Sequence, residues 1–101
     1  MPVARPRIIV APFTTLGAGI SSTATSLTVT TGGGAQFPTV STGKLLISLQ
    51  SATDPSWVEF IYCAAHSAGS DSFTSLTRGQ LGTVGLAFVT GDLVTEILYT
   101  P

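Results

Sequence analysis

The fold is decided by residues 57–83, which read WVEFIYCAAHSAGSDSFTSLTRGQLGT. Residues 57–64 are rich in aromatic and β-branched side chains, which is typical of a central β-strand. Ser, Gly and Asp gather over residues 66–71 and indicate a turn. Residues 72–78 are expected to form the next strand, and residues 79–82 the turn that ends it.

Similar signals extend to both sides of this stretch. Apolar and polar residues alternate over residues 26–30 and 44–50, and further strands are expected over residues 84–90 and 93–99, with a tight turn at Gly91 and Asp92. Short strands every 8 to 12 residues predict an all-β fold, a small antiparallel β-sandwich or β-barrel. The predicted core comprises Leu27, Val29, Leu45, Ile47, Leu49, Phe60, Leu76, Val94 and Leu98.

Composition excludes several classes of function. The chain has 101 residues, a net charge of -1 and 9% charged residues, against roughly 25% in ordinary soluble domains. It therefore lacks the clustered Lys and Arg of a nucleic-acid binder, and no 20-residue apolar run predicts a membrane span. With one Cys, one His and five carboxylates, we expect no disulfide, metal, cofactor or enzymatic activity. The sparse charge also leaves edge strands unguarded, so we expect copies of the chain or a larger lattice to cover them.

Residues 1–16 are expected to form an extended N-terminal arm on a single β domain of residues 17–101. Pro2, Pro6 and Pro12 disfavour helix there. Pro12, Thr14 and Thr15 leave the apolar run too short for a convincing signal peptide. An extended apolar segment is costly in water, so we expect it to bind a neighbouring subunit by strand addition or groove filling. The predicted partner-binding residues are Arg5, Arg7, Ile8, Ile9, Val10 and Phe13.

Three groups of residues could carry chemistry, and each has a simpler interpretation. His66 has Ser67, Ser70 and Asp71 near it, but adjacency in sequence does not make a catalytic triad, and an exposed turn is expected. Cys63 lies in an apolar strand and is expected to be a buried small hydrophobe. The aromatic residues of the strand from residue 57 are expected to pack in the core rather than stack on sugar rings; they are Trp57, Phe60 and Tyr62.

Glu59 and Arg78 are charged residues that interrupt predicted apolar strands. A buried charge is tolerated when it is paired and hydrogen-bonded. We therefore expect Arg78 to reach Glu59 across neighbouring strands, or to bind the carbonyl groups of the turn over residues 79–82. The alternative is that both side chains are exposed on a polar face.

Residues 76–83, LTRGQLGT, resemble a small β module of tailed-bacteriophage virion proteins. In such modules a strand with a carboxylate, here Glu59, precedes an Arg-Gly-x-x-Gly-Thr-like turn, here Gly79, Gly82 and Thr83 after Arg78. Residues 26–29, Phe37 with Pro38, and residues 91–94 extend the resemblance to about residues 20–95. Phe88 departs from it, because such modules often carry His there, which puts a metal or polar role at this position in doubt.

The resemblance implies a structural protein of the virion. A short chain without a fibre repeat fits a capsid decoration (cement) protein on the outer surface of the phage head. Such a protein often forms a homotrimer, and its arm would bridge subunits of the major capsid protein and stabilise the expanded head. A tail, fibre-attachment or baseplate component is the alternative from the same resemblance, and a small enzyme or lectin-like domain is the alternative outside it.

Overall fold

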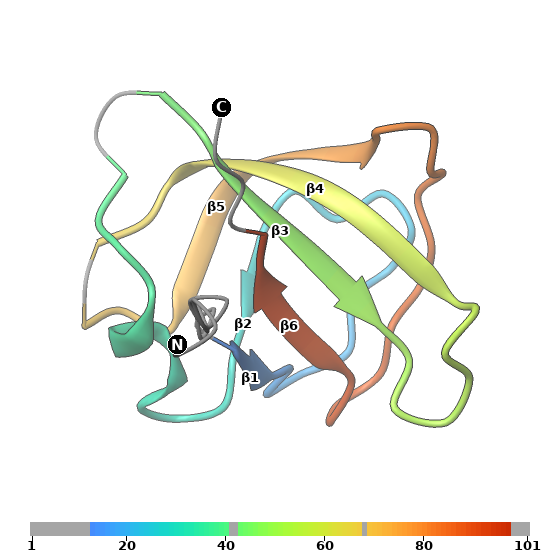
Figure 1. Ribbon diagram of the computed structural model, residues 1–101. Helices are drawn as coiled ribbons and strands as arrows, with labels where there is room; N and C mark the ends of the chain where they lie inside the picture. Colours follow the sequence, from blue (N-terminus) through green and yellow to red (C-terminus); the bar gives the residue numbers. More distant parts are fainter. Residues whose placement is uncertain (1–12, 41–42, 68, 98–101) are drawn as a thin grey trace, which may run out of the picture.

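The computed structural model describes residues 13–40, 43–67 and 69–97 (Figure 1). Within these residues the chain forms six strands and one short 3-10 helix, and every strand pairing is antiparallel, which confirms the predicted all-β fold. In chain order the elements are β1 (Phe13–Thr15), β2 (Leu27–Thr28), η1 (Gly33–Gln36), β3 (Leu45–Gln50), β4 (Val58–Ala65), β5 (Ser72–Gln80) and β6 (Leu93–Glu96).

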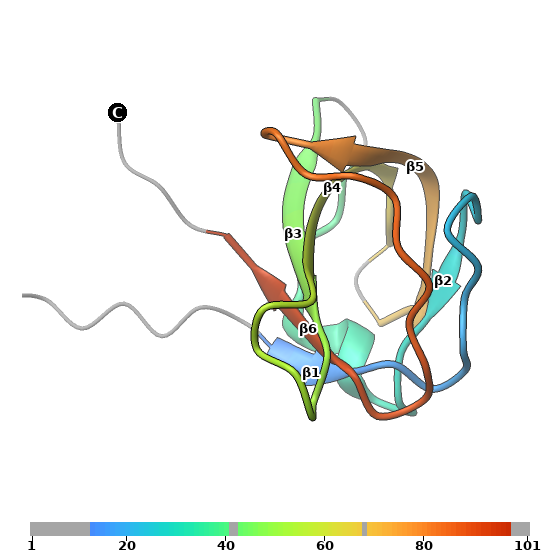
Figure 2. The ribbon, with the colours of Figure 1, turned by 90° about the vertical axis from the view of Figure 1, so that its right-hand side faces the viewer.

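The strands form one strongly curved sheet in the order β1-β6-β3-β4-β5-β2 (Figure 2). Its two outermost strands meet just beyond β1 and β2, where Leu16 forms a bridge with Val29. The amide of Gly17 donates to the carbonyl of Thr28 (2.9 Å), and the amide of Thr30 donates to that of Thr15 (2.8 Å). The chain thus joins its own sheet edges at this point, where we expected copies of the chain or a lattice to cover them.

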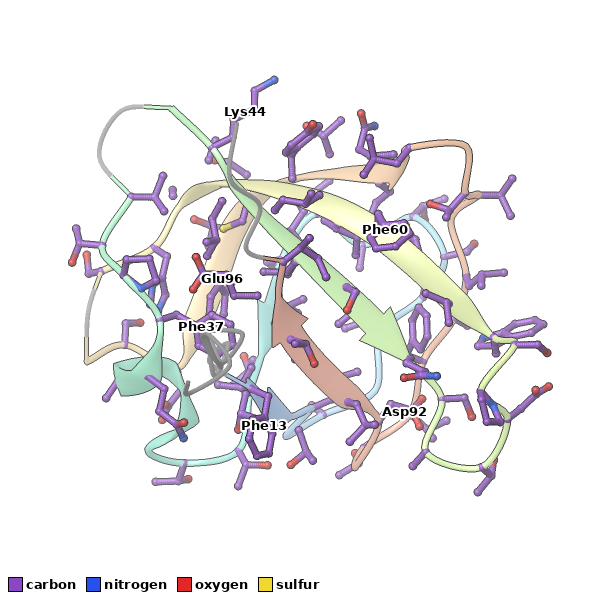
Figure 3. The ribbon with its side chains drawn as sticks, viewed as in Figure 1. Phe13, Phe37, Lys44, Phe60, Asp92 and Glu96 are labelled. Atoms are coloured by element: carbon purple, nitrogen blue, oxygen red, sulfur yellow. The ribbon has the colours of Figure 1, made fainter. Side chains whose placement is uncertain are left out.

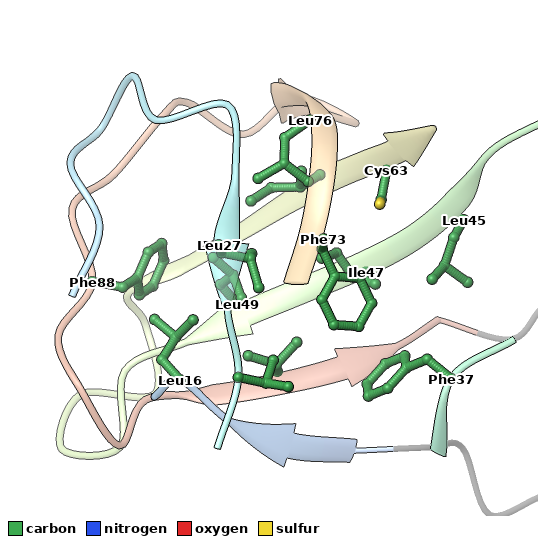
Figure 4. Packing of buried hydrophobic residues seen from close by; sticks show 13 residues of the cluster. Leu16, Leu27, Phe37, Leu45, Ile47, Leu49, Cys63, Phe73, Leu76 and Phe88 are labelled. Atoms are coloured by element: carbon green, nitrogen blue, oxygen red, sulfur yellow. The ribbon is translucent and has the colours of Figure 1, made fainter. Parts of the chain in front are cut away.

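The curved sheet encloses one hydrophobic core, in which side chains from opposite walls pack together (Figure 4). Every predicted core residue is in this cluster except Phe60 and Leu98, and Leu98 is outside the described residues. The prediction for Phe60 was wrong by one residue, since β4 directs Glu59, Ile61 and Cys63 inward. The buried cluster comprises Leu16, Leu27, Val29, Phe37, Leu45, Ile47, Leu49, Ile61, Cys63, Phe73, Leu76, Phe88 and Val94.

The boundary predicted between arm and domain at residue 16 is wrong. Phe13–Thr15 is strand β1 and pairs with β6, and Leu16 is completely buried. The reason is that the backbone of residues 13–15 pairs with that of β6, and the Leu16 side chain packs in the hydrophobic core. The other predicted arm residues lie outside the described part of the chain; they are Arg5, Arg7, Ile8, Ile9 and Val10.

Residues 84–90 do not form the predicted strand. They make a single bridge, between Phe88 and Ile20, and Phe88 buries its ring in the core. The backbone of Leu86 instead bonds to side chains, because its amide donates to Glu59 and its carbonyl accepts from Arg78. The Glu59 and Arg78 side chains thus bind the backbone amide and carbonyl of Leu86, which a neighbouring strand would otherwise bind.

Candidate functional site

A buried ion pair joins neighbouring strands β4 and β5. Glu59 is completely buried, and its two carboxylate oxygens accept from Arg78 Nε and Nη2, each at 2.8 Å. The amides of Gly79 and Leu86 also donate to this carboxylate at 2.8 Å. Each carboxylate oxygen thus accepts two hydrogen bonds. The cross-strand pair is the first arrangement expected from the sequence, and the alternative of two exposed side chains is wrong.

Arg78 also holds two loops against the sheet. Its Nη1 group donates to the carbonyls of Ser21 (2.8 Å) and Ala24 (3.0 Å), and its Nη2 group donates to that of Leu86 (2.5 Å). These carbonyls belong to the flanking loops. The second arrangement expected from the sequence, in which Arg78 binds carbonyls of the turn over residues 79–82, therefore does not form. All five N–H groups of the guanidinium are therefore engaged within the chain. We call this arrangement of Glu59 and Arg78 the clasp.

The predicted turn residues lie beside the clasp. Gly79 and Gly82 have φ angles of 65° and 83°, in the region that favours glycine. The hydroxyl of Thr83 donates to the carbonyl of Gln80 (2.6 Å) and accepts from the amide of Phe60 (3.1 Å). The Thr83 hydroxyl thus ties the turn back to β4.

His66 is buried, and the prediction of an exposed turn residue was wrong. Its ring stacks on Phe73 with centroids 4.0 Å apart. Nδ1 lies 2.8 Å from the Pro38 carbonyl, and Nε2 lies 2.9 Å from the Ser70 carbonyl. Asp71 faces elsewhere, because its carboxylate accepts from the amides of residues 32 and 34. Among the residues that the structure describes no Ser-His-Asp triad forms, and His66 instead ties two loops together.

Two other reactive groups of the described chain are also held by its backbone. Burial raises the pKa of the Cys63 thiol, whose Sγ contacts the carbonyls of Ala65 and Thr74, so the nucleophilic thiolate is disfavoured. The carboxylate of Asp92 accepts from the amides of Ala52 and Val89. Among the described residues no three metal-ligating side chains gather, and no helix is long and apolar enough to cross a membrane.

An apolar surface covers part of the outside of the sheet. Residues that face each other across antiparallel strands share a face, and Leu46 faces Tyr62 while Phe60 faces Ser48. Ser48 in turn faces Thr95, which faces Phe13. The side chains of Phe13, Lys44 and Phe60 can be located in Figure 3. We call this surface the outer apolar face; it comprises Phe13, Leu46, Phe60, Tyr62, Leu81 and Ile97.

A pocket of ≈ 340 Å³ opens on the outer apolar face. Its walls are Leu46, Tyr62, Leu81 and Ile97, and the Lys44 ammonium lies 5.2 Å from the centre of the Tyr62 ring. Phe60 and Tyr62 were expected in the core and instead lie half-buried on this face. Trp57, also expected in the core, is 43% exposed, and its indole N–H donates to the carbonyl of Ala87.

The sequence analysis missed the outer apolar face, although a signal for it was present. Leu45, Leu46 and Ile47 are consecutive in β3, and all three are buried. Since successive side chains of a strand point to opposite faces, such a run requires apolar contact on both faces. Comparison with family models and with curated proteins gives no match to this sequence, so its site is interpreted from geometry and chemistry alone.

Proposed function

We propose that this protein is a structural component of a bacteriophage virion, a capsid decoration protein that binds the outer surface of the expanded head. The outer apolar face is the observation that carries the proposal. Phe13 and Leu81 expose 58% and 60% of their surface there, on a chain with 9% charged residues. A lattice-binding protein needs such an adhesive surface rather than a reactive site.

The clasp also supports this proposal. The residues that carry the resemblance to phage modules are those that form the clasp and its turn, and their polar groups are occupied within the chain. They hold loops in place against the curved sheet, which suits a protein that contributes rigidity to a shell. In the proposed role the partners are the major capsid protein and further copies of this chain, assembled as a homotrimer.

Binding to one state of a particle stabilises that state by mass action. A decoration protein that binds only the expanded head therefore raises the stability of the expanded head. Many copies on one lattice add avidity, so a modest affinity per copy is sufficient. The arm, which carries Arg5 and Arg7, would bind acidic capsid surface.

Co-sedimentation with heads of the phage that encodes the chain tests the proposal. The purified full chain should sediment with expanded heads that lack decoration protein, and not with unexpanded heads. Leu81→Asp, which places a charge on the outer apolar face at an exposed position, should weaken this binding at least tenfold. Val89→Asp is the matched control, because Val89 is 66% exposed but belongs to the loop before β6, where its amide donates to Asp92. Equal binding to both head forms, or none to either, would refute the proposal.

A tail, fibre-attachment or baseplate role is the second candidate. Trp57 favours it, because this large aromatic ring is 43% exposed at the end of the loop that joins β3 to β4. Exposed aromatic rings are common contacts in protein recognition. Binding to isolated tails or to host-surface glycans that is lost in Trp57→Ala, with no binding to heads, would support this candidate over head decoration.

A further inference from the structure

The pocket on the outer apolar face has an apolar floor and apolar walls. Leu46 forms the floor, because it lines the pocket and yet is only 6% exposed. Tyr62 faces Leu46 from β4, and the amide of Ile97 donates to the Leu46 carbonyl (2.9 Å), so Tyr62 and Ile97 flank the floor on opposite sides. Leu81, in the turn after β5, completes the walls and is 60% exposed.

Leu81 occupies a backbone conformation that disfavours its own side chain. Its φ angle is 54°, in the left-handed region that glycine adopts at no steric cost. Backbone strain of this kind is concentrated at ligand-binding and other functional sites. Here it holds a large apolar side chain at the edge of the pocket.

Lys44 adds one positive charge beside these apolar walls. Its ammonium group is exposed and lies 5.2 Å from the centre of the Tyr62 ring. Within residues 13–40, 43–67 and 69–97, Glu59 and Arg78 form the only ion pair, so the Lys44 ammonium has no carboxylate within salt-bridge distance there. An apolar pocket with a single polar group at its edge is the usual form of a small-molecule site. The charge of Lys44 favours an anionic ligand.

The surroundings of the pocket favour an alkyl chain over a peptide or a second copy. The backbone of β3 pairs with β4 on one side and with β6 on the other, so its N–H and C=O groups are already bonded. A peptide in the pocket would bring polar backbone groups that apolar walls cannot bind, which is costly. A second copy packed through the outer apolar face would supply no carboxylate to Lys44, since that face contains none. An alkyl chain has no such polar groups and gains from leaving water.

We propose that this pocket binds the alkyl chain of a medium-chain fatty acid, whose carboxylate pairs with the Lys44 ammonium. The pocket volume of ≈ 340 Å³ is at the lower end of the range of about 300–1,000 Å³ that small-molecule sites have. The proposal concerns the isolated protein and does not depend on a phage particle. Its consequence, that a bound fatty acid competes with the capsid for Leu81, rests on the proposed function.

NMR titration of the purified full chain with sodium octanoate tests the proposal. The methyl signals of Leu46 and Ile97 should shift until they saturate, while those of Val89, in the loop before β6, should not. Octan-1-ol has the same chain without the charge and should bind more weakly. Octyltrimethylammonium should bind most weakly, because it brings a second positive charge to Lys44. Lys44→Gln should weaken octanoate binding about twofold to fivefold, the range of an exposed ion pair, and should leave octan-1-ol binding unchanged.

Leu81→Gly removes one wall of the pocket and keeps the fold, because glycine adopts the φ angle of this position without strain. It should weaken octanoate binding about tenfold through the lost apolar contact. Ser75→Gly is the matched control, since Ser75 also has a φ angle of 54° but does not line the pocket. This control should bind octanoate as the wild type does.

Several results would overturn the proposal. Unchanged signals of Leu46 and Ile97 would do so, as would equal binding of octanoate and octyltrimethylammonium. Full binding of octanoate by Leu81→Gly would place the ligand elsewhere. Binding to phosphatidylglycerol vesicles without a response to monomeric octanoate would assign the pocket to a membrane surface instead, which also contradicts the proposal. No phage head is involved in these measurements, so a failure of head binding leaves them readable.

Discussion

Replacing Arg78 by Ala should destabilise the fold more than any other removal of a charge that the structure describes. The substitution deletes the guanidinium from the clasp and leaves the Glu59 carboxylate with no exposed surface. Two of the four hydrogen bonds to that carboxylate remain, from the amides of Gly79 and Leu86. The carbonyls of the two flanking loops lose their donor as well.

The size of the loss follows from this burial. Removing one partner of a buried ion pair costs about 3–5 kcal/mol, because the remaining charge is uncompensated. The Arg78 side chain is 10% exposed, so water can reach the vacated loop carbonyls, which favours the lower limit. We therefore expect a loss of about 3 kcal/mol in the free energy of unfolding, or roughly 12–24 °C in Tm for a domain of this size.

Urea unfolding monitored by circular dichroism measures this loss. Lys44→Ala is the matched control, since Lys44 is exposed and its removal should change stability by no more than about 0.5 kcal/mol. Arg78→Lys keeps the charge but loses the planar fork, and should fall between the wild type and Arg78→Ala. If Arg78→Ala costs less than about 0.5 kcal/mol, the clasp does not hold the loops and our reasoning is wrong.

Three further predictions concern other buried or half-buried groups. His66→Phe keeps a ring on Phe73 but removes the ring nitrogens that lie within hydrogen-bond distance of two loop carbonyls, so a thermal melt should show a loss of about 1–3 kcal/mol; an unchanged Tm would contradict this. Burial raises the pKa of Glu96 in the folded protein above its value in the unfolded chain. Between these two pKa values the folded protein binds more protons than the unfolded chain, so the free energy of unfolding falls as pH rises through that window. Glu96→Gln should therefore be more stable than wild type at pH 7 but not at pH 3, as measured by urea unfolding at both values; equal stability at pH 7 would argue against it. Gly34→Ala would place a Cβ 1.8 Å from the Ser70 carbonyl oxygen and should reduce folded yield and Tm far more than Gly32→Ala, which meets open space and strains only its own backbone at a φ of 85°; similar losses would contradict the crowding.

The register of β4 shows where sequence patterns stop being informative. Residues 57–64 are apolar on both faces, so alternation could not decide which set points inward. The structure directs Glu59 inward and Phe60 outward, because the inward carboxylate meets Arg78 and two amides while the outer apolar face accepts the ring. A charge in the core and an aromatic ring outside it contradict the usual hydrophobic pattern.

The candidate site was predictable in part. Burial of a charge demands a partner of opposite sign, so two charges interrupting neighbouring strands could be paired from sequence. The outer apolar face could not be assembled in that way, because its side chains come from β1, β3, β4, the turn after β5 and the residue after β6. Their proximity depends on a strand order that local sequence does not encode.

The all-β class, most strand positions, most of the core and the pairing of Glu59 with Arg78 follow from the sequence alone. They follow because alternation, turn residues and the cost of burying an unpaired charge act locally or between few residues. Joining of the sheet edges at Leu16 and Val29, burial of His66 and the pocket beside Leu81 were decided only by the tertiary structure. Each of these depends on contacts between segments far apart in the chain, and such contacts exist only once the sheet has curved on itself.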